Sequence, residues 1–342
     1  MTAIGDGAQL RHYFPFDRQS TLKQFSQEQL LANLDRMLLI RNFETRAEAA
    51  YLQGHIGGFF HSYIGQEAIQ TAALEAMGAE NWWITSYRCH ALALLLGATP
   101  NEIMAELYGR ANGNAMGRGG SMHLYTDRLL GGFGIVGGQL PIATGAAYTI
   151  KYQGNTKEAA ICFCGDGAIA QGAFHEALNQ ASLWDLPVLF VIENNQWGMG
   201  TAVERAISVS RLAEDKAPGY RMEGYSFDGM DFFACYAGFK ALYEQVLTTQ
   251  RPVLIECVTE RFKGHSISDP GLYRSKEELQ CSQQRDPIVL LKQELEQLGW
   301  IDDETFKSKD KQYRQLAVDA MKHAEQSPWP DPATLEHDVY AP

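Results

Sequence analysis

The chain has 342 residues, a formal net charge of −12 and 45% hydrophobic residues. This negative charge argues against the phosphate backbone of a nucleic acid as a binding partner. The sequence contains no run of about 18 apolar residues, so we expect neither a transmembrane helix nor a membrane partner. Its start matches no secretory or transit pattern, and its six cysteines are scattered without metal-ligand spacing. These features predict a cytoplasmic protein.

The first predicted helix follows an N-terminal arm. Residues 1–25 are expected to be irregular, whereas residues 26–342 are expected to form a single domain. Ser26 and Gln29 form a capping-box pattern, which predicts a helix that runs to about Tyr51. The charged residues of this helix are expected on its solvated or interfacial side; they are Arg41, Glu44, Arg46 and Glu48.

Two histidines and an arginine lie near predicted turns. His55 and His61 belong to a glycine- and aromatic-rich segment, where a structural role is favoured over a catalytic one. A helix is predicted over residues 65–77, and a short strand between residues 81 and 90. Arg88 near the end of that strand is a candidate anion-binding residue, because a planar guanidinium matches phosphate and carboxylate. Considered alone, Arg88 is better explained by a surface salt bridge.

Residues 109–138 contain ten glycines interleaved with large apolar residues, which favours a long functional loop over disorder. Within this segment, Gly132-Phe-Gly134-Ile-Val-Gly137 matches the G-x-G-x-x-G pattern of dinucleotide-binding proteins. That pattern requires a strand immediately before it. Asp127-Arg-Leu-Leu-Gly131 makes a poor strand, so we interpret the match as a coincidence. Small residues over 141–152 predict a helix that packs closely, as at a subunit contact.

The centre of the sequence carries a strand–helix–strand unit. Residues 158–164 and 187–192 are short apolar runs typical of buried strands, and residues 171–184 have helical spacing between them. Such units are parallel and right-handed, so both strands end at the same edge of the sheet. Asp166 follows the first strand and Asn195 follows the second, so both side chains are expected to face one ligand. The predicted fold class is α/β with a parallel sheet.

Asp166 lies between Gly165 and Gly167, and Asn195 is the second of two consecutive asparagines. A carboxylate and an amide oxygen at adjacent strand ends favour Mg²⁺, which prefers oxygen ligands and often shares them with phosphates. The flanking glycines allow a close backbone approach, and the N-terminus of the following helix offers N–H groups to an anion. The sequence therefore predicts a metal–diphosphate site at the carboxyl edge of the sheet.

The remaining predicted elements extend the same sheet edge. A strand end is expected near residues 226–229, and Asp231 is expected to cap a helix that continues to about residue 249. Residues 252–259 are predicted to form another strand, which leads into a polar loop. His265 in that loop is expected to face the same site. From about residue 280 the chain is predicted to be helical, with helices over 286–298 and 303–326.

Gly165-Asp-Gly167, followed after 26 residues by Asn194-Asn195, resembles the diphosphate-binding motif of thiamine diphosphate enzymes. Over residues 26–340 the chain resembles the alpha subunits of thiamine-diphosphate-dependent 2-oxoacid dehydrogenases, closest to the acetyl-transferring pyruvate dehydrogenase branch. The other segments that carry the resemblance are 60–67, 86–88, 117–123, 134–137 and 264–271. This resemblance implies a parallel-sheet thiamine diphosphate-binding fold with helical N- and C-terminal extensions.

The resemblance also implies the site residues. In the family, positions matching Asp166, Asn195 and the backbone carbonyl of Trp197 hold Mg²⁺. The positions that match the family's thiamine diphosphate site are Tyr87, Arg88, Gly134, Val136, Asp166, Gly167, Ala168, Asn195 and His265. His61 and His265 are implied as catalytic, since histidine titrates near neutral pH. The chain departs from the family at Trp197, where tyrosine is usual, and at Lys263, where relatives often have histidine.

The implied reaction is the oxidative decarboxylation of a 2-oxoacid, with pyruvate the closest match. It is followed by reductive acetylation of a lipoyl group on a dihydrolipoamide acetyltransferase, leading to acetyl-CoA. The implied partners are that acetyltransferase and a beta subunit, in an α2β2 heterotetramer. In the family, a second α/β domain supplies the acid that activates the cofactor's pyrimidine ring. We find no second parallel-sheet domain here, so this acid is expected on the beta subunit.

Several alternatives remain open. A branched-chain 2-oxoacid or acetoin dehydrogenase alpha subunit is the alternative within the family, although residues 264–271 favour the pyruvate or acetoin side. An NAD-dependent oxidoreductase using Gly132 to Gly137 belongs to a different class. The intact Asp166, Asn195 and His265 argue against a non-catalytic scaffold subunit. Serines 266 and 268 share the His265 loop, and in some relatives serines here are phosphorylated, which adds negative charge.

Overall fold

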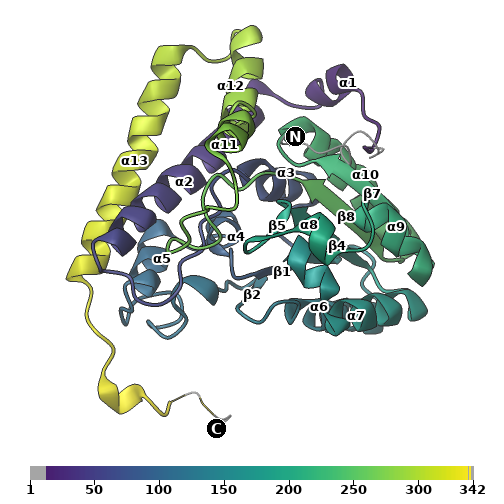
Figure 1. Ribbon diagram of the computed structural model, residues 1–342, viewed down its shortest axis with the longest axis horizontal. Helices are drawn as coiled ribbons and strands as arrows, with labels where there is room; N and C mark the ends of the chain where they lie inside the picture. The colour runs from purple at the N-terminus through teal and green to yellow at the C-terminus, as the bar shows by residue number, and fades with distance from the viewer. Residues whose placement is uncertain (1–12, 338, 340–342) are drawn as a thin grey trace.

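The computed structural model describes residues 13–337 and 339 (Figure 1). Most of the predicted irregular arm, residues 1–12, lies outside the described residues, as does the chain start that matched no targeting pattern. The described part of the arm contains the short helix α1 (Arg18–Leu22), and Tyr13 forms a parallel β-bridge to Ser226. No helix within the described residues combines the length and the apolar character needed to cross a membrane.

Six parallel strands form the centre of the molecule, in the order β2-β1-β3-β4-β8-β7. Their bounds are β1 (Trp82–Ser86), β2 (Leu129–Phe133), β3 (Ala160–Gly165), β4 (Val188–Asn194), β7 (Glu223–Asp228) and β8 (Val253–Val258). A separate antiparallel ribbon pairs β5 (Trp197–Gly198) with β6 (Thr201–Ala202). The α/β fold class is thus confirmed, and β3 and β4 are neighbours, with Gly165 opposite Glu193.

Helices cover both faces of the sheet because alternate strand residues point to opposite sides. Ile161 and Phe163 of β3 belong to one buried apolar cluster, and Cys162 and Cys164 to the other. The first cluster includes residues of α2 (Gln27–Leu52), α3 (Glu67–Met77), α4 (His90–Leu95), α5 (Pro100–Leu107), α10 (Phe232–Thr249), α12 (Pro287–Gln297) and α13 (Asp303–Gln326). The second includes residues of α6 (Gln139–Tyr152), α7 (Gly172–Leu183) and α9 (Leu212–Lys216).

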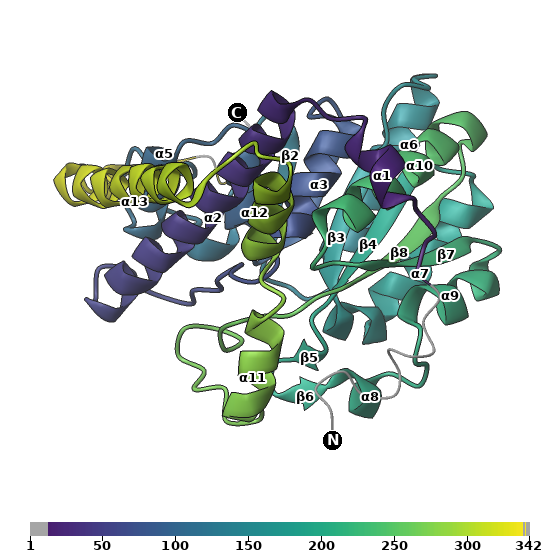
Figure 2. The ribbon, with the colours of Figure 1, turned by 90° about the horizontal axis from the view of Figure 1, so that it is seen from above.

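The helical extensions lie to one side of the sheet. The long helix α13 runs beside α2, at the opposite end of the molecule from α7 and α9 (Figures 1 and 2). Two short helices, α8 (Val203–Ala206) and α11 (Lys276–Gln283), lie near the β5–β6 ribbon (Figure 2). Capping boxes begin α2 at Ser26, as predicted, and also α5 at Thr99 and α11 at Ser275.

The prediction of a long loop over residues 109–138 is wrong in part, because regular structure interrupts it. The segment contains a 3₁₀ helix (Gly120–Met122) and the edge strand β2, which pairs with β1. Low strand propensity hid β2, yet packing requires its glycine: a Cβ on Gly132 would lie 2.6 Å from the Cys89 sulfur. Because β2 runs into the glycine pattern and α6 follows it, the reason for treating that pattern as a coincidence was also wrong.

The prediction that the charged face of α2 is solvated or interfacial is wrong for Glu44. This side chain is fully buried, accepts a hydrogen bond from the Tyr63 amide at 3.0 Å and lies 3.1 Å from Nδ1 of His90. Arg41 is also largely covered, because its guanidinium pairs with Glu67 of α3 and with Asp286, which caps α12. Tertiary packing of α2 against α3, α4 and α12 therefore turned a charged stripe inward.

Candidate active site

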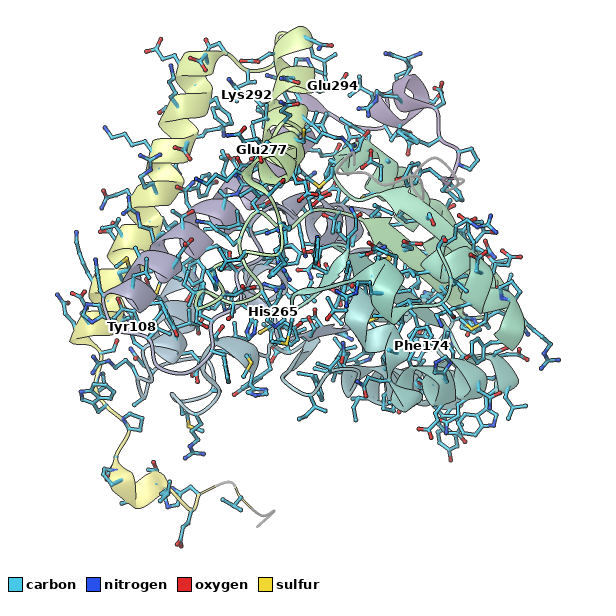
Figure 3. All side chains as sticks on the ribbon, in the orientation of Figure 1. Tyr108, Phe174, His265, Glu277, Lys292 and Glu294 are labelled. Carbon is cyan, nitrogen blue, oxygen red and sulfur yellow. The ribbon has the colours of Figure 1, made fainter. Side chains whose placement is uncertain are left out.

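A cavity of about 780 Å³ opens at the carboxyl ends of β1, β3 and β4. Its lining includes every predicted site residue: His61, Tyr87, Arg88, Gly134, Val136, Asp166, Gly167, Ala168, Asn195, Trp197 and His265. His265 lies near the centre of the molecule, between the helical side and the sheet (Figure 3). By contrast, His55 stacks on Tyr108 and does not line this cavity. Residues that are far apart in sequence are thus assembled around one space.

Three groups with oxygen atoms suited to bind a metal ion line one wall of this cavity: the side chains of Asp166 and Asn195 and the backbone carbonyl of Trp197. Asp166 is 3% exposed, and burial raises the pKa of its carboxyl to about 6, although the nearby guanidiniums oppose this shift. Among the described residues, no ion pair involves Asp166. The Oδ1 atom of Asn195 accepts a hydrogen bond from the Trp197 amide at 3.3 Å, and Nη1 of Arg261 lies 3.4 Å from the Trp197 carbonyl oxygen. The wall therefore holds a buried carboxylate without a paired cation.

The two glycines beside Asp166 leave open space. A Cβ on Gly165 would meet no atom within 4 Å, and one on Gly167 would make only an ordinary contact with Gly198 at 3.6 Å. No protein contact therefore demands glycine at either position. The space beside these two glycines, here called the glycine cradle, is free for a ligand. The helix predicted over residues 171–184 is observed as α7 (Gly172–Leu183), and Asp166–Ala170 before it form a 3₁₀ helix. The N–H groups nearest the cradle belong to this 3₁₀ turn.

Arg88 is buried rather than part of a surface salt bridge, so that interpretation was wrong. The side chain is 5% exposed, and it donates to the carbonyl oxygen of Ser62 at 2.7 Å and to that of His265 at 2.6 Å. Burial lowers the pKa of its guanidinium to about 10, so it remains a cation at neutral pH. Arg88 therefore places a positive charge on the cavity wall and ties together the segments that carry His61 and His265.

Two histidines and a tyrosine form a ring cluster at the cavity. The ring centroids of His61 and His265 are 5.0 Å apart, and that of Tyr87 lies 4.4 Å from His61. Burial and the Arg88 guanidinium lower the pKa of His61 to about 2 and that of His265 to about 4. Both imidazoles are therefore neutral at neutral pH. Each also has a buried Nδ1 atom without a hydrogen-bond partner.

Four unpartnered polar atoms provide a test of whether the cavity suits a bound cofactor. Besides Nδ1 of His61 and of His265, they include Nε2 of Gln66 and Oε1 of Gln139, and all four residues line the cavity. Buried polar groups in native proteins are nearly always hydrogen-bonded, so these atoms indicate that a polar ligand completes the site. The Asp166 carboxylate, which has no ion-pair partner among the described residues, and the open space beside Gly165 and Gly167 suit a divalent cation with a diphosphate. The residues present therefore fit magnesium thiamine diphosphate.

Comparison with known proteins gives the same family as the residue pattern. The family described as "Dehydrogenase E1 component" matches residues 35–333. The pyruvate dehydrogenase E1 component subunit alpha of Rickettsia felis is 41% identical over 317 residues, which cover 92% of this chain and 97% of that protein. The protein of the same name from Rhizobium meliloti is 39% identical over 322 residues, covering 93% and 92%. The mitochondrial one from Schizosaccharomyces pombe is 38% identical over 331 residues, covering 96% and 80%.

The chain belongs to the dehydrogenase E1 component family. It is therefore an oxidoreductase of a thiamine-diphosphate-dependent family, and these relatives favour neither the branched-chain and acetoin alternatives nor the NAD-dependent one. The glycine pattern at 132–137 fits this conclusion, because Gly134, Val136 and Gly137 line the same cavity as Asp166. The strand and helix around the pattern thus serve the site already described.

Some residues of this E1 site escaped the sequence analysis. Arg261, Asp269 and Tyr273 form a network that holds the His265 loop: Asp269 accepts from the His265 amide and the Tyr273 hydroxyl, both at 2.6 Å. Arg261 donates to that hydroxyl at 2.6 Å. Glu193 also lines the cavity, and burial raises the pKa of its carboxyl to about 7. Its place at a strand end directly before Asn194 was the available signal.

Proposed function

We propose that this chain is the alpha subunit of a pyruvate dehydrogenase. The enzyme oxidatively decarboxylates pyruvate and reductively acetylates the lipoyl group of a dihydrolipoamide acetyltransferase, leading to acetyl-CoA. The observation that carries this proposal is the single cavity that unites Asp166, Asn195 and the His61–His265 pair. It occurs in a chain whose relatives, matched over nearly their full length, bear the name pyruvate dehydrogenase.

We propose that the side-chain oxygens of Asp166 and Asn195 and the carbonyl oxygen of Trp197 hold Mg²⁺. Thiamine diphosphate is proposed to lie against the remaining predicted positions: Tyr87, Arg88, Gly134, Val136, Gly167, Ala168 and His265. When bound, it supplies the electron sink for decarboxylation. The buried Arg88 guanidinium adds positive charge to this anion site, and the low exposure of Asp166 strengthens its attraction for the cation.

The two histidines are proposed as proton carriers and orienting groups beside the reacting atoms. Their depressed pKa values keep both rings neutral, and each presents an unpartnered Nδ1 that can exchange a hydrogen bond with the reacting atoms. His265 owes its place to backbone contacts, because its amide donates to Asp269 and its carbonyl accepts from Arg88. Its imidazole is therefore free of structural hydrogen bonds at Nδ1.

The proposed partners are a beta subunit, in an α2β2 heterotetramer, and the lipoyl-bearing acetyltransferase. Exposed apolar side chains at the cavity, Phe59, Val136 and Met199, support a partner surface at its mouth. The cytoplasmic location remains a prediction from the sequence.

The substrate is tested with the purified complex of this chain and its beta partner. Pyruvate, branched-chain 2-oxoacids and acetoin are compared by reduction of an artificial electron acceptor. We expect pyruvate to have the highest kcat/KM. A higher kcat/KM for a branched-chain acid or for acetoin would overturn the pyruvate assignment, and fluorescence titration with NAD serves as the control for the dinucleotide alternative.

A further inference from the structure

Gln66 directly precedes α3, yet its side chain does not cap that helix. The side chain is 1% exposed and lines the cavity. Helix α3 lies between α2 and α10 in both ribbon views (Figures 1 and 2). Gln66 at its N-terminus lines the cavity at the carboxyl edge of the sheet. There Oε1 of Gln66 accepts a hydrogen bond from Nδ2 of Asn195 at 3.0 Å.

The hydrogen bonds around Asn195 determine which way its carboxamide faces. The Trp197 amide is a donor only, so the atom of Asn195 that it contacts at 3.3 Å is the oxygen, Oδ1. Nδ2 then faces Gln66, which must present its own oxygen to that donor. An inverted Asn195 would set two N–H groups against each other at Trp197. Gln66 and Trp197 together therefore hold the Asn195 oxygen in one orientation.

The same constraint leaves Nε2 of Gln66 as a donor without a partner. This atom is buried and makes no hydrogen bond within the described residues. An unsatisfied buried donor costs about 1–3 kcal/mol, so a ligand acceptor at this position would recover that free energy. The neighbouring Asn195 belongs to the proposed metal–diphosphate end of the cavity, where anionic oxygens are expected.

We propose that Gln66 is a further binding residue, which orients the Asn195 carboxamide for the metal ion and donates from Nε2 to an anionic oxygen of the diphosphate. This inference rests on the proposed thiamine diphosphate function and adds to it a neutral donor. A neutral amide contributes a directed hydrogen bond without placing another positive charge beside Mg²⁺ and Arg88.

The test uses the full-length chain, stripped of cofactor, and inorganic diphosphate with Mg²⁺ as the probe in titration calorimetry. Gln66→Met keeps the length of the side chain but removes both the acceptor and the donor. We expect diphosphate affinity to fall roughly 10- to 100-fold, the usual effect of losing a partner of a metal ligand. The matched control is Gln70→Met, one turn later on α3. Gln70 is fully buried and bonds to Glu193, but it neither contacts Asn195 nor lines the cavity.

A second variant separates the donor from the folding of the site. Gln66→Glu retains an oxygen acceptor for Asn195 but replaces the donor with an acceptor. At saturating Mg²⁺ we expect it to bind diphosphate more weakly than the wild-type chain. Wild-type affinity in both Gln66 variants would overturn the inference, as would equal losses in Gln66→Met and Gln70→Met. A wild-type chain that binds no magnesium diphosphate would instead refute the proposed cofactor function.

A third measurement distinguishes the diphosphate from the carboxylate of the 2-oxoacid as the group that accepts the Gln66 hydrogen bond. In the complex with the beta partner at saturating thiamine diphosphate, we expect the KM for pyruvate to be unchanged in Gln66→Met. A raised KM together with wild-type diphosphate affinity would overturn the diphosphate assignment, because the donor would then serve the carboxylate of the 2-oxoacid.

Discussion

Asp166 is the only ionised side chain in the proposed metal ligand set. Asp166→Ala should abolish magnesium-dependent binding of thiamine diphosphate, because it removes the charge that compensates the cation in a buried site. Calorimetry measures the loss. Asp319→Ala on α13 is the control. That carboxylate is exposed, and it contacts Lys322 and Gln315 of the same helix. Unchanged affinity in Asp166→Ala would remove the residue from the metal site.

His265 combines a free imidazole nitrogen with a backbone held by Asp269 and Arg88. His265→Ala keeps those backbone contacts, so cofactor affinity should be spared. Turnover should fall by roughly 100-fold or more, the scale of an acid–base contribution. The two effects are measured by calorimetry and by pyruvate-dependent reduction of an electron acceptor. The exposed His323→Ala provides a matched control, and normal turnover in His265→Ala would assign the residue a structural role.

At the scale of elements, α5 organises the glycine-rich segment through one carboxylate. Glu106 is fully buried, and its Oε2 accepts from the amides of Ala115 and Gly117 at 2.7 and 2.8 Å. Its Oε1 accepts from Gly119 and Gly120 at 2.7 and 3.0 Å. The loop can wrap this closely only with glycine beside α5: a Cβ on Gly113 would lie 2.5 Å from the Glu106 backbone. The segment is thus ordered by buried hydrogen bonds, and it delivers Met122 to the cavity.

Glu106→Gln should therefore destabilise the chain. An amide NH₂ would face two of the four backbone donors, and leaving buried donors unsatisfied costs about 1–3 kcal/mol each. We expect a lower Tm and faster hydrogen exchange at residues 115–120, measured by mass spectrometry. Glu176→Gln on the exposed face of α7 is the control. A wild-type Tm and exchange pattern would show that the loop is held by other contacts.

At the scale of the whole molecule, one exposed surface is rich in aromatic side chains. A groove of about 930 Å³ runs over α6 and α7, and Tyr148, Tyr152 and Trp184 line it; Tyr152 is 83% exposed. Exposed apolar surface of this kind marks an interaction site. The described residues also form only one parallel sheet. Both features support the proposal that the active enzyme needs further subunits.

The chain alone should therefore be inactive. In the family resemblance, the acid that activates the cofactor's pyrimidine ring comes from a second α/β domain, so the proposed beta subunit must supply it. Expression of the chain alone and together with its partner, followed by the pyruvate-dependent assay, measures the difference. Full activity of the lone chain would mean that the activating acid lies within these 342 residues.

The sequence by itself determined the elements and motifs whose signals are local. Apolar runs located β3, β4 and β8 to within two residues or so, and the parallel-connection rule placed Asp166 and Asn195 at one edge. The motifs carried the family resemblance, and the site residues that this resemblance implied all line the cavity. These features depend on short-range periodicity and backbone geometry, which a single sequence records directly.

Only the tertiary structure decided the features that depend on contacts between distant segments. The edge strand β2 is held by pairing with β1 despite its glycines, and Glu44 is buried because α2 packs against α4. Arg88 finds carbonyl partners in two loops, and its charge helps keep His61 and His265 neutral. The burial, the hydrogen-bond partners and the pKa of a side chain depend on neighbours from distant parts of the chain. A local sequence pattern therefore does not record them.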